Sequence, residues 1–242
     1  MTKAGTKVSG DVSSATQRYL PYLEEAQRKL LTVAAGFFIA AVLGFVYYRQ
    51  ILKFIMGQFD LEGINIVLTN PYQVIGLAIN TGLFTGLLVA IPLVVYQMLN
   101  FLKPALKVKE FKLLISLLPL SFILFISGFA FGVYVVQFVI RLFSRATLDF
   151  SVGNLWDIGR FFSQILLSAL SLGIVFQFPI VLTMLLKTKV ITKDQVIEKR
   201  RHVYAAALVF AALLPPTDIF SLFLMVVPLF ILFELTLLFN RQ

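Results

Sequence analysis

Long uncharged apolar runs alternate with short basic segments along almost the whole chain. The first run, 30–48, has 19 residues without a charge, and 40 uncharged residues precede Lys103. Further runs occupy 113–140 and 161–186, and the last one, 202–240, is 39 residues long. Because about 20 apolar residues in a helix span the hydrocarbon core of a bilayer, this pattern predicts transmembrane helices.

The last run is interrupted at its centre by Pro215 and Pro216, which a straight helix does not accommodate. We divide it there into two short spans that only just cross, with local thinning of the bilayer around them. The prediction is an all-α polytopic membrane protein with six transmembrane helices in one concave bundle, residues 30–240. The approximate spans are 30–48, 73–102, 113–140, 161–186, 202–216 and 219–239.

Residues 1–29 are polar and mixed in charge, and glycines and serines are frequent in their first half. This composition indicates a mostly disordered cytoplasmic tail that ends in an interfacial helix near residues 19–29. The apolar run that follows has no A-x-A-like exit, so we expect a retained span rather than a cleaved signal peptide.

Four prolines, Pro92, Pro119, Pro179 and Pro228, fall inside the predicted spans. Each removes a backbone hydrogen bond and bends its helix. Four bent helices can form a concave, functional groove, but irregular packing between neighbouring helices explains the prolines equally well.

Composition limits the classes of function. Of the 242 residues, 59% are apolar and only 14% are charged, with a mean hydropathy of +0.91, as expected where lipid is the main solvent. The chain has no cysteine and one histidine, His202, so we expect no disulfide, no metal site and no cofactor. It also lacks a nucleotide-binding loop, a zinc-protease motif and a credible catalytic triad, so we expect no enzyme.

The net charge of +9 is distributed as a topology signal rather than as a nucleic-acid surface, so no nucleic-acid partner is expected. Sixteen Lys and Arg residues lie in the amino-terminal tail, in alternate connections and at the carboxyl terminus, against five on the opposite side. This asymmetry places both termini in the cytoplasm and requires an even number of spans.

Polar residues inside the predicted spans are costly in lipid and are therefore candidate functional residues. Glu234 lies deep in the last run, where it either pairs with Arg241 at the interface or faces a cavity. Asp218 follows the double proline and is expected to cap the next helix. Gln177 either forms a hydrogen bond across the bundle or faces a cavity, and Gln97 is an interfacial anchor at a helix end.

Acidic residues are scarce on the basic, cytoplasmic side. Glu25 precedes the first span and Glu110 precedes the third. Each can pair locally, Glu25 with Arg28 or Lys29 at helical spacing, and such pairs contribute only tenths of a kcal/mol. The two carboxylates can instead form a receptor for a guanidinium-bearing ligand, because carboxylates bind arginine in bidentate geometry.

Six segments stand out in chain order: YLEEAQRKL (22–30), PLVVYQMLNFLKPALKVKE (92–110), FISGFAFGVYVV (125–136), GIVFQFPIV (173–181), LLPPTD (213–218) and VVPLFILFE (226–234). Together they resemble one family along nearly the whole chain, namely TatC, the C subunit of the twin-arginine (Sec-independent) protein translocase. The order and spacing of these segments agree with the six-span topology.

The resemblance implies a multi-pass protein of the cytoplasmic (inner) membrane, or of its organellar equivalent, that binds twin-arginine signal peptides. It further implies export of folded proteins powered by the proton gradient, with single-span TatA-type and TatB-type subunits, surrounding lipid and further copies of itself as partners. By position, the residues implied for signal-peptide binding are Glu25, Glu110, Phe101 and Pro104. Those implied for intramembrane or partner contacts are Gln97, Gln177, Asp218 and Glu234.

The chain departs from the family pattern at a few positions. Tyr22 and Ala26-Gln27 replace a usual His and Leu-Arg, Phe111-Lys112 replaces an Arg pair, and Gln177 stands where many relatives carry Glu. Two other classes of function remain open. One is a small-solute secondary transporter, which the absence of an internal repeat disfavours; the other is a membrane scaffold without receptor function.

Overall fold

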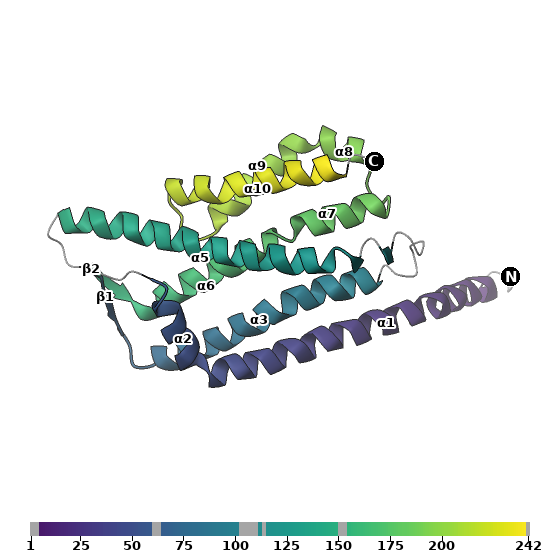
Figure 1. Ribbon diagram of the computed structural model, residues 1–242. Helices are drawn as coiled ribbons and strands as arrows, with labels where there is room; N and C mark the ends of the chain where they lie inside the picture. Colours follow the sequence, from purple (N-terminus) through teal and green to yellow (C-terminus); the bar gives the residue numbers. More distant parts are fainter. Residues whose placement is uncertain (1–4, 60–63, 102–110, 113–114, 150–153, 241–242) are drawn as a thin grey trace.

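The computed structural model describes residues 5–59, 64–101, 111–112, 115–149 and 154–240 as a bundle of long helices (Figure 1). Both chain ends approach the same end of this bundle, where α3 and α7 also terminate. We call it the basic end, because the segments that follow α3 and α7 there are rich in Lys and Arg. The opposite end carries two short strands, and we call it the sheet end. The elements are α1 (Gly5–Val46), α2 (Tyr48–Met56), β1 (Ile64–Val67), α3 (Gln73–Phe101), α5 (Leu118–Asp149), β2 (Asn154–Asp157), α6 (Ile158–Val175), α7 (Phe178–Lys187), α8 (Lys193–Glu198), α9 (Arg200–Leu213) and α10 (Ile219–Phe239).

The predicted class, a helical membrane bundle, is confirmed. Within the described residues, five helical segments are long and apolar enough to cross a membrane, and α6 with α7 counts as one of them. The sixth predicted crossing corresponds to α9, which has 14 residues. At 1.5 Å per residue it is about 21 Å long, clearly less than the roughly 30 Å of a hydrocarbon core. The bundle therefore has five full-length crossings and one short one, and the short helix pairs with α10.

Helices α1 and α5 each extend beyond the span expected from the sequence, for identifiable reasons. Helix α1 is continuous from Gly5, whereas a disordered tail was expected. The change from polar to apolar residues near Leu30 marks where the helix can enter lipid and does not interrupt its hydrogen bonds. Helix α5 extends to Asp149, past the predicted end at Ile140, because the arginines that follow end an apolar run but not a helix.

The prolines act at helix starts as well as within helices. Pro92 and Pro228 lie inside α3 and α10. Pro179 lies in the first turn of α7, so the predicted fourth span is divided into α6 and α7. The expectation that Pro119 bends the interior of the third span was wrong, since α5 begins at Leu118 and places this proline in its first turn. The missing N–H costs nothing in a first turn.

Close backbone contacts hold the long helices together. Helix α1 packs along α3, and α5 packs along α6. A Cβ built on Gly82 of α3 would lie 2.7 Å from the carbonyl oxygen of Ala41, and one built on Gly132 would lie 2.5 Å from the Cα of Ala169. Lipid offers no hydrophobic driving force between helices, so small residues that permit such approach determine where membrane helices meet.

The sheet end is closed by elements that the sequence analysis did not anticipate. Strands β1 and β2 pair in parallel, with Ile64 opposite Asn154 and Val67 opposite Asp157. Apolar residues of α2, α5 and α6 form a core beneath them. Only the β-branched residues of Ile64–Val67 could have indicated a strand, and four residues are too few for a reliable alternation pattern.

Asp157 links the strands of the sheet end to the first turns of α3 and α6. Its carboxylate accepts hydrogen bonds from the backbone N–H of Arg160 at 2.9 Å, from Gln73 Nε2 at 2.6 Å and from the Thr69 hydroxyl. The Thr69 hydrogen bond, followed by those from Arg160 and Gln73, lowers the pKa of Asp157 from 3.8 to about 2. The folded state thus favours the ionised form of this side chain.

We expect Gly132→Ala to lower the free energy of unfolding by about 1–3 kcal/mol, because the added methyl group forces α5 away from α6. Thermal unfolding of the purified chain in detergent measures the effect. Gly76→Ala is the matched control, since a Cβ there meets no atom within 4 Å. Equal unfolding midpoints for the two variants would contradict the close-packing argument.

We expect the stability contribution of Asp157 to depend on pH. A carboxyl whose pKa is lower in the folded than in the unfolded state stabilises the fold above the unfolded pKa of 3.8, and this contribution disappears as the pH falls toward about 2. The unfolding midpoint of Asp157→Asn should lie below that of the parent chain above about pH 4, with the gap narrowing between pH 4 and pH 2. A gap independent of pH over this window would contradict the assignment.

Candidate functional site

The first candidate site lies at the basic end, where α1 passes the last turn of α3. Lys29 Nζ pairs with Glu25 Oε1 at 2.5 Å, and the same ammonium lies 5.2 Å from the centre of the Phe101 ring. The structure therefore brings together Glu25 and Phe101, two residues that the sequence analysis named, and Lys29 is the contact between them. The local pairing of Glu25 with Lys29 at helical spacing is confirmed.

Glu25 is accessible from outside. Its side chain is 43% exposed, the Phe101 residue is 42% exposed, and Lys29 is the only ion-pair partner of Glu25 among the described residues. A hollow of about 530 Å³ adjoins the carboxylate, and its described lining comes from Glu24, Glu25, Gln27, Arg28 and Leu31 of α1. The carboxylate at this hollow, together with the aromatic ring that Lys29 also contacts, is suited to a cationic side chain.

The remaining residues named for signal-peptide binding have different placements. Glu110 and Pro104 lie outside the described residues. Gln97 is half-buried in the last turns of α3, one turn before Phe101. It belongs to the same helix end as the site, in the position expected of an interfacial residue.

Gln177 is buried at the junction of α6 and α7, where it binds across the bundle. Its Nε2 donates to the Ser121 carbonyl at 3.0 Å, and its Oε1 accepts from the Ser121 hydroxyl at 2.5 Å. Of the two alternatives left open by the sequence, the hydrogen bond across the bundle is confirmed. Both polar groups of the amide are thereby satisfied within the protein, as burial in an apolar surrounding requires.

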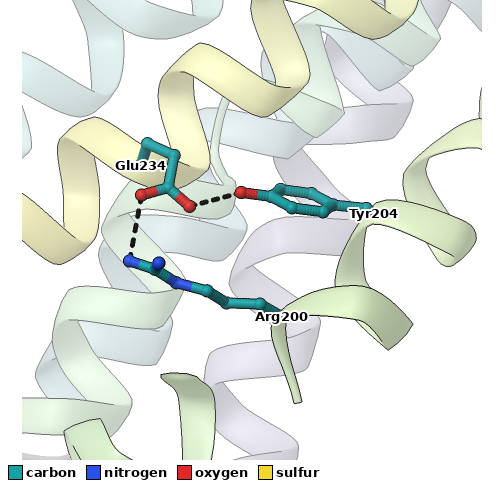
Figure 2. A network of polar contacts seen from close by, with 3 residues as sticks. All are labelled: Arg200, Tyr204 and Glu234. Carbon is teal, nitrogen blue, oxygen red and sulfur yellow. Dashed lines mark hydrogen bonds and ion pairs between the residues drawn. The ribbon is translucent and has the colours of Figure 1, made fainter. Parts of the chain in front are cut away.

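Glu234 lies on α10 and joins two residues of α9 (Figure 2). It accepts a hydrogen bond from the Tyr204 hydroxyl and forms an ion pair with Arg200, whose Nη2 is 3.1 Å from Glu234 Oε2. Arg241, the partner expected from the sequence, lies outside the described residues. The carboxylate thus fastens the short helix α9 to α10.

An apolar groove runs beside this network, between α3, the junction of α6 with α7, and the α9–α10 pair. Its volume is about 600 Å³. Gln177 and Tyr204 contribute to its lining, whereas nearly all the other lining side chains are apolar. Asp218 is not among them. It caps α10 at the other end of the helix, accepting from the Ser221 N–H at 2.8 Å, which confirms the capping role.

The fold and these sites agree with one known family. The profile of the family described as Sec-independent protein translocase protein (TatC) matches residues 21–228. The chain belongs to the TatC family. It is therefore a multi-pass membrane component of the Tat system for protein transport, and this family is not generally regarded as enzymatic.

Similar TatC proteins cover nearly all of the chain. TatCy of Bacillus subtilis is 29% identical over 228 residues, which make up 92% of this chain and 88% of that protein. TatC of Haemophilus influenzae is 28% identical over 229 residues, with 93% and 90% covered.

The likeness extends to the fold. Two crystal structures of the twin-arginine translocase receptor TatC, one of them in the detergent DDM, superpose with TM-scores of 0.77 and 0.80 at 25% identity. Both cover 91% of this chain, and the chain covers 98% and 100% of theirs.

Sequence reasoning missed the partners of Glu234 in this TatC-family chain. Arg200 was counted only as part of a basic connection, and Tyr204 was not considered. Their spacing of four residues puts them on one face of a helix, which is the available signal. Which helix that face meets depends on the turn at Pro215 and Pro216, and hydropathy does not determine it.

We expect Glu234→Gln and Tyr204→Phe to be coupled by about 1 kcal/mol, because the first removes the charge of the acceptor and the second removes the donor of one charge-assisted hydrogen bond. A double-mutant cycle on thermal unfolding in detergent measures the coupling. Glu24→Gln combined with Tyr204→Phe is the control, since Glu24 lies on α1 and is exposed. Additive effects of Glu234→Gln and Tyr204→Phe would contradict the network.

Proposed function

We propose that this chain is a receptor for twin-arginine signal peptides and a core subunit of the machine that exports folded proteins. The observation that carries the proposal is the exposed Glu25 carboxylate beside the Phe101 ring at the basic end. The name of the similar crystal structures, twin-arginine translocase receptor, supports the same function.

The chemistry of the site favours arginine over lysine. A guanidinium can bind a carboxylate through two parallel N–H···O hydrogen bonds and can stack on an aromatic ring at the same time. Lys29 holds the corresponding position in the structure with one ammonium group. An incoming arginine replaces this single contact with a bidentate one, while a second arginine binds the other acidic residue named from the sequence, Glu110.

The rest of the proposal concerns orientation, partners and energy. Both termini lie at the basic end (Figure 1), which agrees with a cytoplasmic location of that end in the inner membrane or its organellar equivalent. Single-span TatA-type and TatB-type subunits complete the passage, and further copies of the chain assemble with them. The proton gradient supplies the energy, in line with a sequence that has no nucleotide-binding loop.

We expect Glu25→Gln to weaken binding of an Arg-Arg signal peptide by about ten- to a hundred-fold, the equivalent of one lost hydrogen bond to a charged group. Fluorescence anisotropy of a labelled signal peptide on the purified chain in detergent measures the affinity, and a Lys-Lys peptide gives the baseline. Glu198→Gln is the matched control, because it removes the same charge from an exposed position on α8 that is outside the described lining of the hollow.

Lys29→Gln gives the opposite expectation, since it removes the ammonium that competes for Glu25, and binding of the Arg-Arg peptide should tighten. If Glu25→Gln and Glu198→Gln weaken binding equally, the effect is one of overall charge and the assigned receptor site is wrong. If neither Glu25→Gln nor Glu110→Gln reduces peptide binding or export, the scaffold function replaces the receptor function.

A further inference from the structure

The apolar groove between α3, α7, α9 and α10 has no occupant assigned by the proposed function. Its lining includes Met98 of α3, Val181 of α7, Ala207 of α9 and Phe230 of α10. The two polar side chains in the lining are already engaged, Gln177 by Ser121 and Tyr204 by Glu234. The groove therefore presents hydrocarbon to whatever enters it, and it offers no free polar group for recognition.

The chemistry of the lining suits a lipid acyl chain. An acyl chain has no polar group that needs a hydrogen-bond partner, and the groove offers none, because both of its polar side chains are engaged. An acyl chain is also flexible enough to follow an irregular apolar surface between helices.

Positive charge lies at the end of the groove where α9 begins. Lys199, Arg200 and Arg201 precede or form its first turn. Lys199 is on the helix face of Val203 and Ala206, and Arg200 is on the face of Tyr204 and Ala207, all of which line the groove. Lys199 and Arg201 are exposed. Between residues 187 and 201, six basic residues outnumber two acidic ones.

A basic rim beside an apolar groove is complementary to a molecule that has an anionic group and a hydrocarbon chain. We propose that the groove binds an anionic phospholipid, with an acyl chain between α3, α7, α9 and α10 and the phosphate at Lys199. Basic pockets between transmembrane helices bind anionic headgroups in this way. Arg200 contributes to the positive potential while its Nη2 remains paired with Glu234. The inference goes beyond the proposed receptor function and does not rest on it.

Photolabelling of the full chain in phosphatidylcholine vesicles tests the proposal. The vesicles contain a small fraction of either phosphatidylglycerol or phosphatidylcholine probe, both with the same diazirine-bearing acyl chain, and mass spectrometry maps the labelled residues. We expect the phosphatidylglycerol probe to label groove residues preferentially. Lys199→Gln should reduce this preference about five-fold, whereas Arg141→Gln, near the sheet end, should leave it unchanged.

Substitutions that fill the groove with a larger side chain provide a second, independent test. Ala207→Phe should remove most groove labelling by both probes, while Ala205→Phe, two positions away, exposed and outside the lining, should not. Ala206→Leu is a smaller filling change that serves if Ala207→Phe lowers the unfolding midpoint. All three variants can be compared by thermal unfolding in the same detergent.

Three results would overturn the proposal. The first is equal labelling of the groove by the two probes, which would mean that no anionic headgroup is recognised. The second is unchanged labelling in both filled variants, which would place the acyl chain elsewhere. The third is loss of groove labelling in membranes that contain single-span subunits, with crosslinks to a partner helix in its place, which would assign the groove to that helix.

Discussion

A backbone N–H or C=O group without a partner costs several kcal/mol in hydrocarbon, and this constraint governs the whole structure. It accounts for the long helices, and its effect is clearest where a helix cannot continue. At the turn between α9 and α10, the Ser168 hydroxyl of α6 donates to the Pro215 carbonyl, and the Ser221 hydroxyl donates to the Pro216 carbonyl at 2.6 Å. Two serines thus satisfy the carbonyls that the prolines leave outside any helix.

These bonds also determine where the short helix lies. Because α9 is about 21 Å long, it cannot be positioned by spanning the bilayer in the way that α3 or α5 is. It is held at one end by the Ser168 bond to Pro215 and near the other by the Glu234 carboxylate. The apolar groove exists because α9 and α10 are fixed to each other while standing away from α3.

Two carboxylates, Glu234 and Glu25, meet their need for partners in different ways. Glu234 lies within the apolar helix α10 and has both an ion-pair partner and a hydroxyl donor. Glu25 lies at an exposed end, with a single pair that is easily exchanged, since Lys29 is attached to the same helix by a flexible side chain. The first arrangement stabilises the fold, and the second leaves a carboxylate available to a ligand. The two side chains are equally exposed, 43% for Glu25 and 42% for Glu234, so the number and origin of their partners separate the two roles.

The sequence by itself determined the helical class, the positions of most crossings, the cap at Asp218 and the pairing of Glu25 with a basic residue three or four positions further along its helix. These features depend on hydropathy and on contacts within four residues along the chain, which a linear pattern contains. The tertiary structure alone decided the pairing of β1 with β2, the bond of Gln177 to Ser121, and the contacts of Glu234 with Arg200 and Tyr204. Each joins residues at least 30 positions apart, so it depends on which helices become neighbours. That choice is made by glycine contacts and by the turn at Pro215, whose geometry no hydropathy pattern records.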